Sequence, residues 1–323
     1  MKKFTRILSA MVCAALMLSL MAVPALAEGY KIGVIQLVEH DALDAATNGF
    51  VAKLTELLGE ENVEIDVQVA QGEVANCATL ATKFVNDDVD LIMANATPAL
   101  TAAAAATGDI PVLGTSVTDF VSAGVLKDEA IPGVNISGTS DLVSIEAQIE
   151  LLTTLCPEAK TVGILYCSSE PNSVFQADLA VTALNNANIE AKRFTVSDSS
   201  EIQTVLTMAM MEIDALYIPT DNVIADNMGI VANLTIPENM PVICGEENMC
   251  RNGGLATVSI SYQKLGEITG EMAYDILVNG AKVEEMAVRH MEMDQYTYGY
   301  NADVAASLGI TMPENMTPIA MGE

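Results

Sequence analysis

The chain repeats one order of segments, and this repetition limits the folds open to it more than any other feature. Three pairs of segments match: KIGVIQLVEHDALDAA from Lys31 and TVGILYCSSEPNSVFQ from Thr161, VDLIMANATPAL from Val89 and IDALYIPTDNVI from Ile213, and IPVLGTSVTD from Ile110 and MPVICGEENM from Met240. The offsets are 130, 124 and 130 residues. Buried strands of parallel sheets look alike in unrelated proteins, but one order at nearly one spacing favours a duplicated unit.

Each copy of the unit alternates short apolar runs with helical stretches. The strand-like runs begin at Lys31, Val63, Val89, Ile110, Thr161, Ile189, Ile213, Met240 and Leu255. The helical stretches cover residues 43–58, 74–86, 97–107, 141–155, 173–186, 199–211, 222–234 and 262–278. This alternation is typical of βαβ units around a parallel sheet. We therefore expect an α/β fold of two similar Rossmann-like lobes with parallel sheets, joined by a hinge.

The lobe boundaries follow from the repeat. We expect residues 28–137, with about 262–285, to form the N-terminal lobe, and residues 138–261, with about 286–323, to form the C-terminal lobe. The segment PGVNISGTS, residues 132–140, joins the two repeats and is expected to carry the first hinge.

The first 27 residues indicate a separate, cleaved segment. Three basic residues precede an apolar run from Ile7 to Val23, and Ala25-Leu26-Ala27 follows as a small-x-small cleavage site. This pattern is that of a secretory signal peptide rather than a membrane anchor. We expect an exported protein, located in the periplasm or at the outer face of the cytoplasmic membrane.

The charge of the chain excludes several classes of partner. Without the signal peptide, 11 Lys and Arg residues stand against 43 Asp and Glu residues, a formal charge of −32. Nucleic acids and anionic lipid surfaces need basic partners, so we expect neither. The five remaining cysteines are too few for a disulfide-built scaffold, although Cys244 and Cys250 are close enough in sequence to form a bridge.

Candidate binding residues follow the strands of both copies. Ligands of open parallel sheets bind beyond the carboxyl ends of the strands, and the polar segments there cover residues 39–44, 95–97, 115–119, 168–173, 219–222 and 245–248. Two lobes with such segments suggest a clamshell that binds a ligand between them. The candidate site residues are His40, Leu43, Asp44, Ala96, Thr97, Ser116, Asp119, Asn172, Ser173, Asp221, Asn222 and Glu246.

Thr97 and Asp221 occupy matching places at the start of a helix in the two copies. Either could simply cap its helix, a contribution of about 1 kcal/mol. Alternatively, the helix amides at Thr97 bind a carboxylate and Asp221 pairs with an ammonium group. Asp119 and Asp141 are further candidates for the ammonium partner.

His40 stands between Glu39 and Asp41, where a buried strand turns into a helix. It is interpreted either as part of a surface cap or as a residue at the lip of the ligand cleft. With only two histidines in the chain, a three-histidine zinc site is impossible, and no G-x-S-x-G elbow supports nucleophilic catalysis. We expect no cofactor, no metal and no catalytic residue.

The segments after the strands also carry a family resemblance. The chain resembles type I periplasmic binding proteins of the ABC-transporter substrate-binding family, the tryptophan and tyrosine uptake type, from about Lys31 to Gly309. The motifs are VEHDALD (38–44), ANATPAL (94–100), VTDF (117–120), GTSD (138–141), SSEPNS (168–173), IPTDN (218–222) and LGEITGEMA (265–273). Where the family usually has VTDP, this chain has Phe120.

The resemblance implies a monomeric ligand carrier rather than an enzyme. The lobes would close on a small zwitterion, an amino acid with an aromatic or other apolar side chain, and present it to an ABC permease. The head group of the ligand would meet Thr97, Ser116, Asn172, Ser173, Asp221 and Asn222, while His40 and Leu43 would border its side chain. The scarcity of basic residues in these segments argues against phosphate, sulfate and dicarboxylates.

Two other functions stay open on the sequence. Amino-acid racemases of the Asp/Glu type also have duplicated α/β lobes, but they need one cysteine from each lobe, and Asn95–Thr97 and Thr220–Asn222 hold none. A secreted module that passes its ligand state to a membrane receptor would have the same fold as a carrier.

Overall fold

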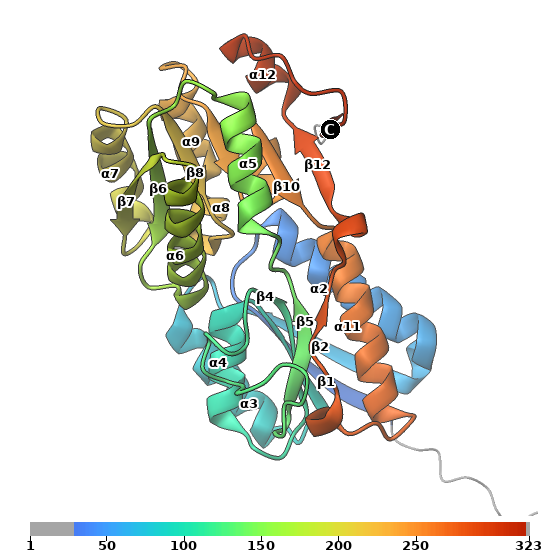
Figure 1. Cartoon of the computed structure of the whole chain (residues 1–323). Helices are drawn as coiled ribbons and strands as arrows, with labels where there is room; N and C mark the ends of the chain where they lie inside the picture. Colours follow the sequence, from blue (N-terminus) through green and yellow to red (C-terminus); the bar gives the residue numbers. More distant parts are fainter. Residues whose placement is uncertain (1–28, 321–323) are drawn as a thin grey trace, which may run out of the picture.

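The computed structural model describes residues 29–320, so the predicted signal peptide lies outside the described part of the chain. The chain forms two α/β lobes, each built on its own sheet (Figure 1). Among the described residues, no helix is long and apolar enough to cross a membrane.

The N-terminal lobe contains a six-stranded sheet in the order β11-β5-β4-β3-β1-β2. All of its neighbouring strands pair in parallel. The strands are β1 (Tyr30–Gln36), β2 (Val63–Val69), β3 (Leu91–Asn95), β4 (Val112–Val117), β5 (Ile136–Ser140) and β11 (Arg289–His290). The central strands β1, β3 and β4 are almost fully buried, which explains their unbroken apolar sequences.

Helices cover both faces of this sheet (Figure 1). Two of them, α2 (Asp41–Leu58) and α11 (Tyr262–Leu277), pack together on one face, and α3 (Val74–Asn86) and α4 (Thr97–Ala106) lie on the other. The contact between α2 and α11 depends on glycine. A Cβ atom at Gly49 would lie 2.2 Å from the carbonyl oxygen of Gln263, and one at Gly266 would lie 1.9 Å from that of Ala46.

The C-terminal lobe contains a seven-stranded sheet in the order β13-β12-β10-β9-β8-β6-β7. It is parallel except for the antiparallel pair of β10 and β12. The strands are β6 (Thr161–Cys167), β7 (Glu190–Val196), β8 (Ala215–Ile218), β9 (Val242–Cys244), β10 (Ala256–Ser259), β12 (Thr297–Tyr300) and β13 (Thr317–Pro318).

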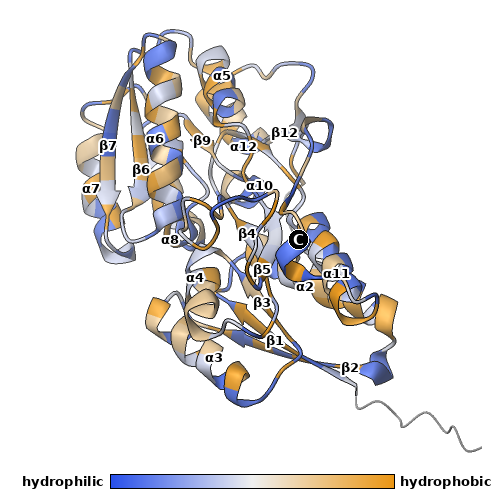
Figure 2. Ribbon diagram, turned by 60° about the horizontal axis from the view of Figure 1, so that its bottom comes forward, coloured by the Kyte–Doolittle hydropathy of each residue, from blue (hydrophilic) through white to orange (hydrophobic). Residues whose placement is uncertain are grey.

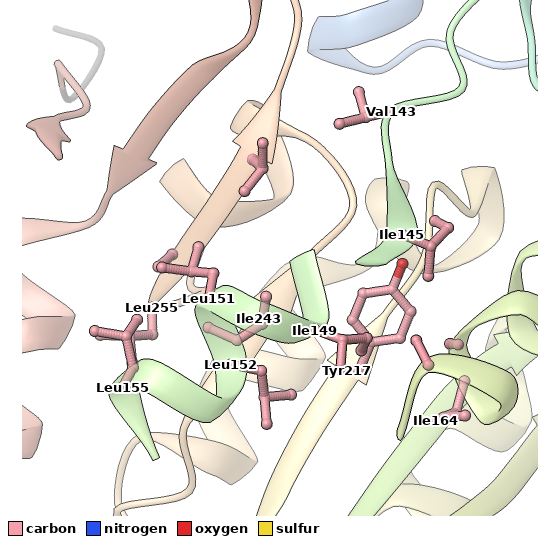
Figure 3. Packing of buried hydrophobic residues seen from close by; sticks show 14 of the residues in the cluster. Val143, Ile145, Ile149, Leu151, Leu152, Leu155, Ile164, Tyr217, Ile243 and Leu255 are labelled. Carbon is pink, nitrogen blue, oxygen red and sulfur yellow. The ribbon is translucent and has the colours of Figure 1, made fainter. Parts of the chain in front are cut away.

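Helices also cover both faces of the second sheet. They are α5 (Ile145–Leu155), α6 (Pro171–Asn186), α7 (Ile202–Ala209), α8 (Asn222–Asp226), α9 (Met228–Thr235), α10 (Glu247–Arg251) and α12 (Ala302–Leu308). Figure 3 shows α5 packing on the sheet around the buried ring of Tyr217, whose hydroxyl donates a 2.6 Å hydrogen bond to Gln148. Hydrophobic residues concentrate in the strands and on the helix faces turned to them (Figure 2).

The two sheets share one strand order, which confirms the predicted pair of similar lobes. The order β2-β1-β3-β4-β5 of the first sheet corresponds to β7-β6-β8-β9-β10 of the second. The matched sequence segments starting at Lys31 and Thr161 contain β1 and β6, so the repeat marks equivalent strands.

The chain crosses between the lobes three times, after β5, between β10 and α11, and after β11 (Figure 1). The strands β5 and β11 both belong to the N-terminal sheet, whereas residues 138–140 and 289–290 were expected in the other lobe. The segment expected to be a linker thus ends in a strand, and the first crossing begins only at Asp141. Gly138 makes this pairing possible, because a Cβ there would lie 2.0 Å from the carbonyl oxygen of Gly114.

Candidate functional site

A small cavity lies between the lobes, where the strands of both sheets end. Its volume is about 20 Å³, room for a water molecule or two, so a larger ligand enters only when the lobes or the lining side chains move. It is lined by His40, Ala42, Leu43, Ser116, Thr118, Asp141, Asn172, Thr220, Asp221, Asn222, Ala225, Glu246, Met249 and Tyr262. A second cavity of about 400 Å³ lies beside it, and both cavities are bordered by Asn222.

Seven of the twelve predicted site residues line the small cavity: His40, Leu43, Ser116, Asn172, Asp221, Asn222 and Glu246. The other five lie outside its lining. Asp44 accepts a 2.6 Å hydrogen bond from Gln36, and Asp119 accepts one from the amide of Ser122. Ala96, Thr97 and Ser173 are buried. Phe120 is also buried and packs against Gly114 rather than forming the cavity wall.

The N-terminal lobe presents Ser116 through an unusual backbone conformation. Ser116 has φ 53°, at the point where the register between β4 and β5 shifts. Its hydroxyl oxygen is buried and has no hydrogen-bond partner among the described residues. Ala96, at the start of α4, also has a positive φ of 88°. Such conformations cost about 1–3 kcal/mol and cluster at binding sites.

The C-terminal lobe presents Asn172 from the first turn of α6. Its side-chain nitrogen donates to the carbonyl oxygen of Thr220 at 3.2 Å and to the carboxylate of Glu170 at 3.2 Å. Its side-chain oxygen is buried without a partner among the described residues. Because an unpaired buried acceptor is costly, this oxygen is an obvious contact for a ligand donor.

Asp221 caps helix α8 and also binds the end of β6. One oxygen accepts from the amide of Ile224 at 2.9 Å, and the other accepts from the amide of Cys167 at 2.6 Å. Protein amides therefore contact both carboxylate oxygens, one through the helix cap and the other through the end of β6. Thr97 does not cap α4, since the cap residue there is Ala96.

Asp141 and Tyr262 meet at the hinge, and neither was among the predicted site residues, although Asp141 was considered as an ammonium partner. The Tyr262 hydroxyl donates to Oδ2 of Asp141 at 2.8 Å, while Oδ1 is buried without a partner among the described residues. In the sequence, Asp141 was indicated by its place in GTSD. Nothing indicated Tyr262, because it lies 121 residues from Asp141 and only the fold brings the two side chains together.

The cavity is acidic, and no lysine or arginine of residues 29–320 lines it. Burial raises the pKa of Asp141 and Asp221, and it raises the pKa of Glu246 to about 7. Each of these carboxyl groups is thus destabilised in its charged form until a cation compensates it. Burial also lowers the pKa of His40, which keeps the imidazole neutral and unable to supply that cation.

Polar contacts between described residues join the lobes around the cavity. Nε2 of His40 lies 3.2 Å from Oδ1 of Asn222, and Nε2 of Gln176 donates to the Thr118 hydroxyl at 3.2 Å. Near the rim, Arg251 lies 3.8 Å from the carboxylate of Asp41. These contacts hold the two lobes together over the cavity.

Comparisons with known proteins identify the family. The family described as "ABC transporter substrate binding protein" matches residues 31–322. The chain belongs to the ABC transporter substrate-binding protein family. The members of this family are substrate-binding proteins rather than enzymes. The five cysteines in the described part of the chain are free, so Cys244 and Cys250 do not form a bridge.

Several relatives of this substrate-binding protein are known. A tyrosine-binding protein of Clostridioides difficile (strain R20291) is 40% identical over 264 residues, 81% of this chain and 76% of the relative. A crystal structure described as an ABC domain in complex with L-Trp, from Streptococcus pneumonia, is 33% identical, covers 90% of this chain and 100% of its own, and has a TM-score of 0.87. A leucine binding protein of Thermotoga maritima shares the type I periplasmic binding fold at 14% identity, with a TM-score of 0.63; the match covers 86% of this chain and 87% of that protein.

The lobe arrangement of this substrate-binding protein resembles that of a relative in complex with L-Trp. A ligand-free, open structure of a substrate binding protein from Clostridium difficile is 41% identical and covers 91% of this chain and 100% of its own, yet its TM-score is only 0.70. The L-Trp complex is less similar in sequence but superposes better. The arrangement of the lobes described here is therefore more similar to that of the L-Trp complex than to that of the ligand-free, open structure.

Proposed function

We propose that this chain is the exported solute-binding component of an ABC importer and that it binds an amino acid with an aromatic or other apolar side chain between its lobes. The observation that carries this proposal is that two buried acceptors of cavity-lining residues, Oδ1 of Asp141 and Oδ1 of Asn172, have no hydrogen-bond partner among the described residues. An α-ammonium group donates several hydrogen bonds, and its positive charge would compensate the negative charge of the buried Asp141 carboxylate.

The α-carboxylate is expected on the N-terminal lobe. Ser116 offers a buried hydroxyl without a partner among the described residues, and Thr118 lines the cavity beside it. A single carboxylate on hydroxyl groups requires no basic residue. A second anionic group would face Asp221 and Glu246 without any cation, so the site disfavours dicarboxylates and phosphates.

The side chain of the ligand is expected among the apolar lining residues. Ala42, Leu43, Ala225 and Met249 form this part of the lining, and His40 adds one polar group. The titles of two relatives name L-Trp and tyrosine, which supports an aromatic ligand for this chain as well.

Closure supplies the link to transport. An open form would admit the ligand, and contacts from both lobes to the ligand would then favour the closed form. The closed form would be the one presented to a membrane permease. The signal-peptide pattern before Glu28 supports a location outside the cytoplasmic membrane.

A binding screen with matched analogues tests the proposal. Purified chain lacking residues 1–27 would be titrated calorimetrically with L-Trp, L-Tyr, L-Phe and L-Leu, and with tryptamine and indole-3-propionate, which each lack one charged group of L-Trp. Because the chain has no tryptophan, fluorescence would report a bound indole directly. We expect the complete zwitterion to bind about 100-fold more tightly than either analogue. Equal affinity for the analogues, or no binding of any amino acid, would contradict the proposal.

A further inference from the structure

Glu170 is a buried carboxylate that is absent from the lining of the small cavity. It precedes α6, its side chain is only 4% exposed, and it holds four donors. Oε2 accepts from Nδ2 of Asn222 at 2.5 Å, from the Asn222 amide at 3.3 Å and from Nδ2 of Asn172 at 3.2 Å, while Oε1 accepts from the Val223 amide at 3.0 Å. One carboxylate thus connects α6 with the first turn of α8.

These contacts determine which way the Asn222 side chain faces. An ionised carboxylate only accepts hydrogen bonds, so the nitrogen of the Asn222 carboxamide must point to Glu170. The oxygen then points the other way, toward Nε2 of His40 at 3.2 Å. Asn172 depends less on Glu170, because its nitrogen also donates to Thr220 and contacts Ser173.

The orientation of Asn222 in turn determines where His40 carries its proton. A carboxamide oxygen only accepts, so Nε2 of His40 must donate. A neutral imidazole carries one proton, and Nδ1 is then left with a lone pair. His40 lines the cavity, so Nδ1 is the ring atom available to accept a hydrogen bond from a ligand.

We propose that Glu170 is a positioning residue that fixes Asn222 and, through it, the Nε2–H tautomer of His40, so that Nδ1 accepts a hydrogen bond from the side chain of the bound amino acid. This selects phenol, indole or hydroxyl side chains over pure hydrocarbon side chains. The inference rests on the amino-acid-binding function proposed above. The indole N–H of tryptophan and the O–H of tyrosine, the amino acids named for two relatives, are both donors.

The tautomer is read directly by ¹⁵N NMR of the imidazole rings. The chain has only two histidines, and His290, which contacts Glu129 in the N-terminal lobe, serves as the internal reference. At pH 8, above the pKa of about 7 that burial and Asp221 give Glu170, we expect His40 to be protonated at Nε2. An Nδ1–H signal for His40 in the wild-type protein would overturn the proposal without any variant.

Variants of Glu170 test the connection. Glu170→Met removes both acceptor oxygens, so Asn222 can turn over, and we expect a mixed His40 tautomer. Glu170→Gln keeps one oxygen for the Asn222 nitrogen, and we expect it to retain the wild-type tautomer. Glu158→Gln, at an exposed position of the same lobe, is the matched control and should change nothing. If Glu170→Gln loses the wild-type His40 tautomer as completely as Glu170→Met, or if Glu170→Met leaves the tautomer unchanged, the proposal is wrong.

Selectivity provides the functional readout. We expect wild type and Glu170→Gln to bind L-Tyr about tenfold more tightly than L-Phe, and Glu170→Met to bind both equally. In an Asn222→Ala background, Glu170→Met should have less than about a twofold further effect on the ratio, since the two residues act in series. Equal binding of L-Tyr and L-Phe by wild type would overturn the selectivity. If wild type bound no amino acid, the proposed function and the selectivity would fail together, while the wild-type tautomer would still decide the role of Glu170.

Discussion

The hydroxyl of Tyr262 donates a 2.8 Å hydrogen bond to Oδ2 of Asp141, and this bond connects two of the three chain crossings between the lobes. Asp141 directly follows β5, and Tyr262 begins α11. The bond occupies one oxygen of the carboxylate and leaves the other free toward the cavity. The residue that we expect to bind the ligand cation therefore lies at the hinge itself.

Replacing Asp141 by Asn removes the proposed partner of the α-ammonium group with little change in shape. We expect Asp141→Asn to weaken amino-acid binding about 30-fold or more, because a charge-assisted hydrogen bond becomes a neutral one. Calorimetry at pH 8 measures the effect. Asp119→Asn, at a predicted site residue outside the cavity lining, is the control and should bind like wild type; a wild-type affinity in Asp141→Asn would remove Asp141 from the site.

Replacing Tyr262 by Phe should shift the pH dependence of binding. Burial raises the pKa of Asp141, and the Tyr262 hydroxyl opposes this rise. Without the hydroxyl, the pKa of Asp141 rises further, so a higher pH is needed to ionise it. Affinity for an amino acid should increase with pH in both proteins, with the midpoint of Tyr262→Phe displaced to higher pH. Tyr298→Phe, on the half-exposed strand β12, should leave the profile in place; an unshifted Tyr262→Phe profile would contradict this link.

Glu246 should make the ligand-free protein less stable as the pH rises. The pKa of Glu246 is about 7 in the folded protein, compared with its ordinary value of 4.5. Between these two pH values the folded chain holds a proton that the unfolded chain has released. Stability therefore falls with increasing pH. The shift corresponds to about 3 kcal/mol, and we expect the free energy of unfolding of wild type, relative to Glu246→Gln, to fall by up to about that amount.

Urea unfolding at pH 5, 6, 7 and 8 measures this difference. Glu56→Gln is the control: Lys53 lowers the pKa of the exposed Glu56 below its ordinary value of 4.5. Its carboxylate is therefore largely ionised in both the folded and the unfolded chain from pH 5 to 8, and the stability difference between wild type and this variant should stay nearly constant. A pH-independent difference for Glu246→Gln would show that Glu246 is ionised in the folded state across this range.

The contact between α2 and α11 should be sensitive to a single methyl group. A Cβ at Gly266 would lie 1.9 Å from a backbone oxygen, so Gly266→Ala must separate the two helices. We expect a loss of about 1–3 kcal/mol in the free energy of unfolding. Gly229→Ala in α9 has no atom within 4 Å of the new Cβ and should be neutral or slightly stabilising, by up to about 1 kcal/mol. Equal stabilities of the two variants in urea would mean that the helices are not tightly packed.

The central strands could be predicted from sequence because parallel strands buried on both faces are continuous apolar runs. The runs from Lys31 and Thr161 contain β1 and β6, and the repeat between them gave the two lobes. The strand β5 was taken for a linker, because its glycine and serines resemble those of a loop. Only its partner, the glycine at position 114, explains why small residues are required there.

The site was predicted in part for a related reason. Ser116 lies near the end of β4 and Asn172 in the first turn of the helix that follows β6, and a parallel sheet brings such positions to one edge. Tyr262 follows β10, but the sequence does not show that the chain returns to the first lobe there and brings this residue beside Asp141. The role of Asp221 was ambiguous in sequence, since a helix cap and an ammonium partner need the same residue type.

The α2–α11 contact also governs when the protein can fold. The first lobe needs α11 and β11, which lie after the whole central part of the second lobe, and the second lobe is completed only by β12 and β13. A nascent chain emerging from the ribosome therefore holds neither lobe in finished form until nearly its last residues have been synthesised. Late completion of this kind would leave the polypeptide incompletely folded for most of its synthesis, which is compatible with the export proposed above.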